Sequence, residues 1–161
     1  METAERFRDA VEKGELDALG GLFTEEIRLY SPVKFTPFEG KPMVLGLFGV
    51  LLRTFEDFRY VGDFEGTAQT SADGEDARST ILVFRATVNG KEIHGIDLLQ
   101  FDEAGLIKEF TVMVRPQSAV HALGQAVLEG LVADGLAPQA VDRQASLPTT
   151  RPSGERAGGS G

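Results

Sequence analysis

The chain of 161 residues carries 25 acidic and 16 basic side chains, which give a formal net charge of −9 at pH 7. This acidic excess argues against a nucleic acid or an anionic membrane as partner, because both are bound through basic patches. The absence of cysteine excludes disulfides and thiolate chemistry, and the N-terminus lacks the apolar core of a signal peptide, so we expect a cytoplasmic protein.

The N-terminal part predicts two helices followed by a strand. Residues 3–13 have helical spacing, with Thr3 as a capping residue and Gly14 as the end of the helix. A shorter helix is expected over residues 16–23. Residues 27–31 alternate between apolar and polar side chains, as in a strand, and stop at a proline.

The next segment predicts an unusually apolar helix. Pro42 suits the first position of a helix that runs to about Phe55, and no charged residue occurs between Lys41 and Arg53. Because the helix is apolar nearly all round, we expect it to be buried on most sides or to cover a cavity.

Four strands and a last helix complete the predicted domain. The strands are expected at residues 58–65, 78–88, 91–101 and 106–115. Asn89-Gly90 predicts a tight hairpin turn between the second and the third. A helix then begins at Pro116 and ends near Gly135. We predict one α+β domain over residues 1–135, a curved antiparallel sheet around the N-terminal helices in the order ααβαββββα, and a disordered tail over residues 136–161.

The hairpin turns allow the strand register to be predicted. The Asn89-Gly90 turn places Leu82 opposite Asp97 and Phe84 opposite Gly95. A loop of four residues after Phe101 would place Asp97 opposite Phe110. One face of the sheet then carries a single acid on an apolar wall: Leu82, Phe84, Ala86, Ile93, Asp97, Leu99, Phe101, Phe110, Val112 and Val114.

The opposite face of the sheet has an apolar centre and charged ends. It carries Ile81, Val83, Arg85, His94, Ile96, Leu98, Glu109, Thr111, Met113 and Arg115. A solvent-facing sheet would be more polar, so this face predicts a second buried surface, most simply a homodimer interface.

Asp97 is the main candidate for chemistry. Burial of an unpaired carboxylate is costly, so such a group is usually partnered, protonated or used in function. Apolar surroundings should raise its pKa, which would suit a proton donor near neutral pH. The alternative is a structural acid whose hydrogen bonds are satisfied by neighbouring groups.

The element order and three motifs resemble the SnoaL-like branch of the nuclear-transport-factor-2-like proteins. The motifs are Ser31-Pro32, Phe38-Glu-Gly40 and the stretch from Gly95 to Ile107. The resemblance implies a cone-shaped fold over roughly residues 3–134. It does not imply one activity, because isomerases, cyclases, epoxide hydrolases, dehydratases and binding proteins share this fold.

Two relatives indicate what the site lacks. The resemblance to ketosteroid isomerase places its oxyanion-hole aspartate on Asp97, its general base on Ser31 and its oxyanion-hole tyrosine on Phe7. The resemblance to limonene epoxide hydrolase places an arginine on Gly95 and requires an aspartate that residues 110–115 do not contain. Neither reaction is therefore expected, whereas a polyketide cyclase of the SnoaL branch needs only an acid–base group in an apolar cavity.

We therefore predict an apolar pocket with Asp97 as the catalytic acid–base group if the protein is an enzyme. It would act without metal or cofactor on a hydrophobic small molecule. Expected ligand-binding residues are Ser31, Phe7, Phe35, Phe48, Phe58, Leu82, Phe84, Phe110 and Val112. The alternatives are a non-catalytic binder of an apolar metabolite and a structural dimerisation module.

Overall fold

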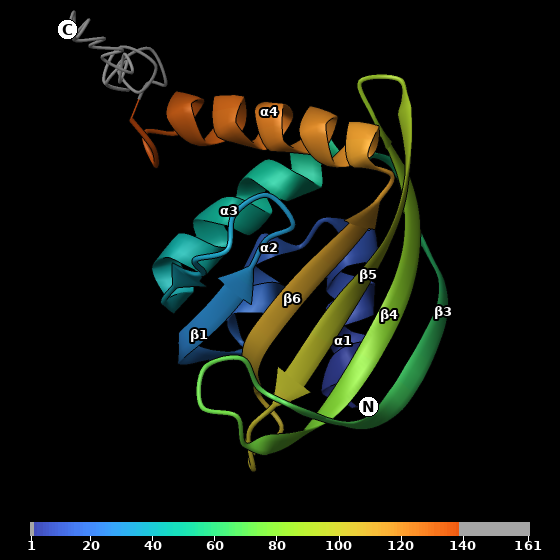
Figure 1. Cartoon of the computed structure of the whole chain (residues 1–161). Helices are drawn as coiled ribbons and strands as arrows, with labels where there is room; N and C mark the ends of the chain where they lie inside the picture. The colour runs from blue at the N-terminus through green and yellow to red at the C-terminus, as the bar shows by residue number, and fades with distance from the viewer. Residues whose placement is uncertain (1, 139–161) are drawn as a thin grey trace, which may run out of the picture.

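The computed structural model describes residues 2–138 and confirms the predicted α+β class (Figure 1). Its elements, in chain order, are α1 (Thr3–Lys13), α2 (Leu16–Gly20), β1 (Phe23–Tyr30), β2 (Phe38–Glu39), α3 (Lys41–Thr54), β3 (Glu56–Gln69), β4 (Asp76–Val88), β5 (Lys91–Phe101), β6 (Ile107–Arg115) and α4 (Gln117–Ala133).

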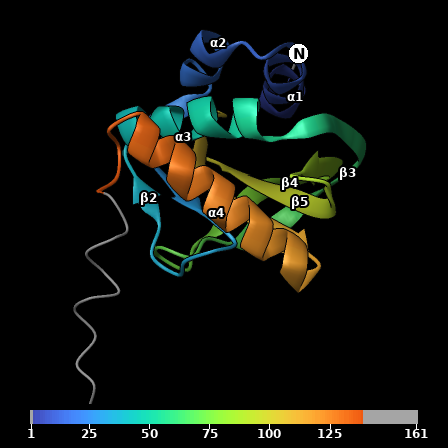
Figure 2. The ribbon, with the colours of Figure 1, turned by 90° about the horizontal axis from the view of Figure 1, so that it is seen from above.

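The six strands form one curved sheet in the order β2-β1-β6-β5-β4-β3. All neighbouring strands are antiparallel except β1 and β6, which run parallel. The sheet curls around the helices, and α4 lies across α3 at its open end (Figures 1 and 2). The two-residue strand β2, which was expected to be loop, pairs with β1 at the edge of the sheet.

The first two helices differ from the prediction at their ends. Thr3 does not cap α1, because it is the first helical residue and its hydroxyl donates to the Gly105 carbonyl at 2.5 Å. Gly14 ends α1 with a φ of 67°, as expected. The second helix ends at Gly20, and Phe23 already belongs to β1. The glycine pair after Leu19 shortens this helix, since glycine is a poor helix former.

The apolar helix α3 is packed between the sheet and α4. Its buried side chains are Val44, Leu47, Phe48 and Val50. Glycines allow α4 and the segment after it to approach closely. A Cβ atom at Gly130 would lie 2.4 Å from Val50, and one at Gly46 would lie 2.7 Å from Leu136. Real Cβ atoms do not approach other atoms this closely, so a larger residue at Gly130 or Gly46 would force Val50 or Leu136 to shift.

The predicted register of β4 and β5 is confirmed, with Leu82 opposite Asp97 and Phe84 opposite Gly95. The register of β5 and β6 was wrong by two residues. Asp97 lies opposite Val112 rather than Phe110, because the connecting loop has five residues and a bulge follows at Phe101. The loop and the bulge each add one residue. Because side chains alternate between the two faces of a strand, a shift of two residues leaves Phe110 and Val112 on the predicted face.

The hairpin of β3 and β4 is longer than predicted and folds over part of the outer sheet face. A bulge between Tyr60 and Gly62 turns Phe64 to the outer face, opposite Ile81. The turn that follows β3 lies against Glu109, whose carboxylate accepts hydrogen bonds from the backbone of residues 71 and 72. Glu109 was expected among the charged ends of the outer face, and it is buried there beneath this turn of the same chain.

The packed part of the chain extends slightly beyond the predicted boundary at residue 135. Leu136 and Ala137 still pack against the hydrophobic core. The predicted disordered tail lies, from residue 139 onward, outside the described residues.

Gly95 is the strand glycine with the tightest surroundings. A Cβ atom there would lie 2.2 Å from Cζ of Phe84, whereas a Cβ at Gly62 on β3 meets nothing within 4 Å. We expect Gly95→Ala to lower the free energy of unfolding by roughly 1–3 kcal/mol, because the buried ring must shift. The matched variant Gly62→Ala should stay near wild type in urea denaturation. Equal stability of the two variants would contradict this packing.

Candidate functional site

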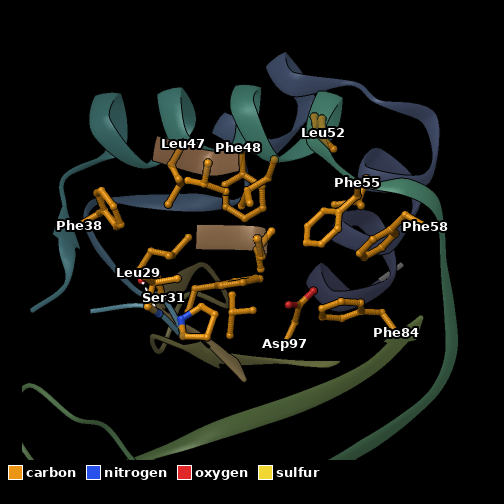
Figure 3. Close-up of a pocket in the computed structure, with 18 of the residues that line it drawn as sticks. Leu29, Ser31, Phe38, Leu47, Phe48, Leu52, Phe55, Phe58, Phe84 and Asp97 are labelled. Atoms are coloured by element: carbon orange, nitrogen blue, oxygen red, sulfur yellow. Dashed lines mark hydrogen bonds between the residues drawn. The ribbon is translucent and has the colours of Figure 1, made fainter. Parts of the chain in front are cut away.

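An apolar cavity of about 580 Å³ lies between the concave face of the sheet and the helices α1, α3 and α4 (Figure 3). This volume is within the range of sites that bind drug-sized molecules. The lining is mostly aliphatic and aromatic, and Asp97 reaches it from the sheet. Figure 3 shows the Asp97 carboxyl pointing from β5 into this space.

Asp97 is 6% exposed and makes one side-chain hydrogen bond. The phenol oxygen of Tyr60 on β3 donates to Oδ2 at 2.9 Å. Burial raises the pKa of Asp97 from its ordinary value of 3.8 to about 7, and the hydrogen bond from Tyr60 opposes this rise by stabilising the carboxylate. Asp97 can therefore be present in both protonation states near neutral pH.

Tyr60 is a part of the site that the sequence did not single out. Its ring lies edge-on to Phe58 and Phe84, with centroids 5.0 and 6.5 Å away. Burial, reinforced by the neighbouring Asp97, raises the pKa of Tyr60 well above its usual range. The phenol thus stays protonated at physiological pH and acts as a donor to the acid.

Ser31 follows β1 and lines the cavity, as expected. Its Oγ accepts hydrogen bonds from the backbone N–H groups of Val33 and Lys34, both at 3.3 Å. These bonds occupy the oxygen as an acceptor and leave the hydroxyl hydrogen available for another group.

Seven of the ten predicted site residues line the cavity: Ser31, Phe48, Phe58, Phe84, Asp97, Phe110 and Val112. Three predictions of cavity lining were wrong. Phe7 is fully buried one layer behind the wall, where its ring packs against Phe48 and Phe110. Phe35 is 96% exposed on the loop before β2, and Leu82 is buried in the core without reaching the cavity.

The sequence missed much of the apolar lining contributed by the helices. These residues include Val11, Leu47, Leu51, Leu52, Phe55, Leu123, Val127 and Leu131. Their helical periodicity marks them as inward-facing, but it does not distinguish a packed core from a cavity wall.

Within residues 2–138, no group of three or more His, Asp or Glu side chains is arranged to hold a metal ion. In the same part of the chain, no helix is both long and apolar enough to cross a membrane. The cytoplasmic location stays a prediction.

The fold and the cavity define a cone-shaped α+β protein of the nuclear-transport-factor-2-like class. The family model of the SnoaL-like domain matches residues 4–110. The chain belongs to the SnoaL-like domain family, as the resemblance predicted. No curated protein matches the chain significantly.

Solved structures support this assignment. A steroid delta-isomerase from Pseudomonas aeruginosa is 34% identical, with a TM-score of 0.72 over 84% of this chain and 93% of that one. An uncharacterised bacterial protein with a cystatin-like fold from Silicibacter pomeroyi is 26% identical, with a TM-score of 0.72 over 83% and 87% of the two chains.

A putative SnoaL-like polyketide cyclase from Shewanella denitrificans is 13% identical, with a TM-score of 0.53 over 76% of this chain and 95% of that one. At this identity, the likeness shows the shared fold alone.

The elevated pKa of Asp97 has a consequence for stability. The folded protein binds this proton more tightly than the unfolded chain, where the carboxyl titrates near 3.8, so this group lowers stability as pH rises from about 4 to about 7. Between pH 4 and 8, ionisation of Asp97 should lower the free energy of unfolding of the wild type by something on the order of 3 kcal/mol. We expect Asp97→Asn to lack this decrease. Urea denaturation at several pH values measures the difference between the two proteins.

The matched control is Asp63→Asn on exposed β3, which should keep the wild-type pH dependence. Parallel stability curves for wild type and Asp97→Asn would show that Asp97 does not hold its proton in this way.

Proposed function

We propose that this SnoaL-like protein is a cofactor-independent acid–base enzyme that acts on a hydrophobic small molecule with a carbonyl group. One observation carries the proposal: the carboxyl group of Asp97 titrates near neutral pH and points into an apolar cavity of about 580 Å³. A group whose pKa lies near the operating pH is well suited to accept and return a proton.

Asp97 supplies the proton-transfer step. Its ionised form removes a proton from the carbon beside the carbonyl, so that the C–H bond breaks and an O–H bond forms on the carboxyl. The electron pair moves to the carbonyl oxygen and gives an enolate. The Ser31 hydroxyl would orient another oxygen of the substrate, on the side of the cavity toward Phe38. Asp97 then returns the proton to carbon. In a ring closure, the enolate carbon instead attacks a second carbonyl of the same molecule, and Asp97 gives its proton to the alkoxide that forms there.

The residues at the site favour a simple proton transfer or cyclisation over the reactions of the two better-equipped relatives. Phe7 and Ser31 stand where the resemblance places the tyrosine and the general base of ketosteroid isomerase. The arginine of limonene epoxide hydrolase would start from Gly95, where Phe84 already fills the space of a Cβ atom. The similarity to a steroid delta-isomerase supports a rigid, polycyclic ketone as the type of ligand.

A non-catalytic binder is the second candidate. The lining favours this candidate because, among the described residues, it holds only one carboxyl group besides Asp97. That group belongs to Glu12, which is exposed at the end of α1, so Asp97 has no second acid beside it for a two-carboxyl mechanism. A binder would use Asp97 as a hydrogen-bonding group and the apolar walls for affinity. A structural module would bind no such ligand.

Hydrogen exchange on a bound ketone separates these functions. We expect the protein to catalyse deuterium incorporation next to the 3-keto group of 4-androstene-3,17-dione in D₂O, measured by mass spectrometry. Asp97→Asn should slow the exchange by roughly 100-fold or more, because it removes the group that transfers the proton. Its affinity for the same steroid should change little.

Steroid binding without protein-dependent exchange would favour the binder. Neither binding nor exchange would favour the structural module.

The outer face of the sheet supports a homodimer, which we also propose. Phe64 is 67% exposed and Met113 is 55% exposed, and both belong to a continuous apolar patch across β3 to β6. The patch consists of Phe64, Ile81, Val83, Ile96, Leu98 and Met113. An exposed apolar surface of this kind is typical of a protein interface.

We expect Phe64→Glu to convert the dimer into a monomer, because it introduces a charge into an apolar contact at the most exposed side chain of the patch. Sedimentation velocity measures the change in mass. Phe35→Glu is the matched control, since Phe35 is also exposed but lies on the loop before β2. A wild-type monomer, or dissociation by both variants alike, would contradict an interface at this face.

A further inference from the structure

A second polar site lies in the cavity lining, where β1 leads into the loop before β2. Ser31 and Lys34 both line the cavity there. Figure 3 shows Ser31 on the side of Phe38, whereas Asp97 lies toward Phe58 and Phe84. The polar groups of the lining therefore divide into two sites, separated by apolar wall.

Lys34 is a cation of the cavity lining that has no acidic partner in the part of the chain that the structure describes. Among residues 2–138, no carboxylate lies within 4.0 Å of its ammonium group. The Nζ atom instead lies 4.0 Å from the ring centroid of Phe38, which also lines the cavity. The other exposed charges of the lining, Glu12 and Lys13, form ion pairs along α1 at 3.2 and 3.0 Å.

The loop that carries Lys34 is held in place on both sides. The Ser31 Oγ accepts hydrogen bonds from the backbone of Val33 and Lys34, which directs the hydroxyl hydrogen elsewhere. The Val33 side chain lies against Gly124 of α4, so closely that a Cβ atom added to Gly124 would be 3.0 Å from Cγ1 of Val33. The loop thus contributes both a hydroxyl donor and a lysine to the lining of the apolar cavity.

We infer that the cavity takes an amphipathic ligand whose carboxylate is bound by Ser31 and Lys34 and whose apolar body extends to Asp97. The inference rests on the proposed function and specifies its substrate class. One carboxylate oxygen can accept from the Ser31 hydroxyl and the other from the Lys34 ammonium, which are charge-assisted hydrogen bonds. The apolar walls then bind the remainder of the molecule.

Two nearly isosteric probes test this inference: 3-oxo-4-androstene-17β-carboxylic acid and its 17β-carboxamide. Their dissociation constants are measured by isothermal titration calorimetry at pH 8 and low salt. We expect the wild-type protein to bind the acid roughly two- to fivefold more tightly than the amide, as an exposed ion pair allows. Lys34→Gln should abolish this preference without weakening the amide, and Lys34→Glu should reverse it.

Lys41→Gln is the matched control, because Lys41 pairs with Glu25 and lies outside the cavity lining. It should keep the wild-type preference for the acid. Equal binding of acid and amide to the wild type, or a preference that survives Lys34→Gln, would overturn the inference and leave the proposed apolar site intact. Failure of both probes to bind would contradict the proposed function as well as the inference.

Discussion

The hydrogen bond from Tyr60 to Asp97 is the interaction on which the character of the site depends. It joins two strands that are not neighbours in the sequence, across the concave face of the sheet. Burial alone would keep the acid protonated, whereas several donors would keep it ionised. A single neutral donor leaves the two forms close in free energy. The place of Tyr60 on β3, opposite Phe84 and within hydrogen-bond distance of Asp97, thus decides how closely the two protonation states of Asp97 are balanced.

Much of the fold follows from local signals in the sequence. The Asn89-Gly90 turn adopts positive φ at both residues, and this short turn determines the pairing of Leu82 with Asp97. The connection between β5 and β6 also turns at a glycine, Gly105, but it has one residue more than predicted, and a bulge follows at Phe101. Neither the longer loop nor the bulge changes the alternation of apolar residues, so the sequence does not reveal them. Register could therefore be predicted where the turn is two residues long and not where loop and bulge compensate each other.

The site was also predictable only where a residue carries a local signal in the sequence. Asp97 stands out because an acid on an apolar strand is costly, and that signal requires no knowledge of distant contacts. Tyr60 carries no such signal, because an aromatic residue on a strand is ordinary, and a long polar turn hides the register between β3 and β4. Phe7 and Phe35 each follow a basic residue in the sequence, yet one is buried behind the wall and the other faces solvent. Composition cannot separate these cases.

Helix α4 closes the cavity but lies beyond residues 4–110, which the family model matches. Its inner face contributes Leu123, Val127 and Leu131 to the lining, while Arg53 of α3 binds Asp134 just after the helix at 2.8 Å. The sheet carries Asp97, and α4 supplies one wall of the cavity. Related proteins could therefore diverge in the molecules they accept through changes in this one helix, while the strand that carries Asp97 stays the same.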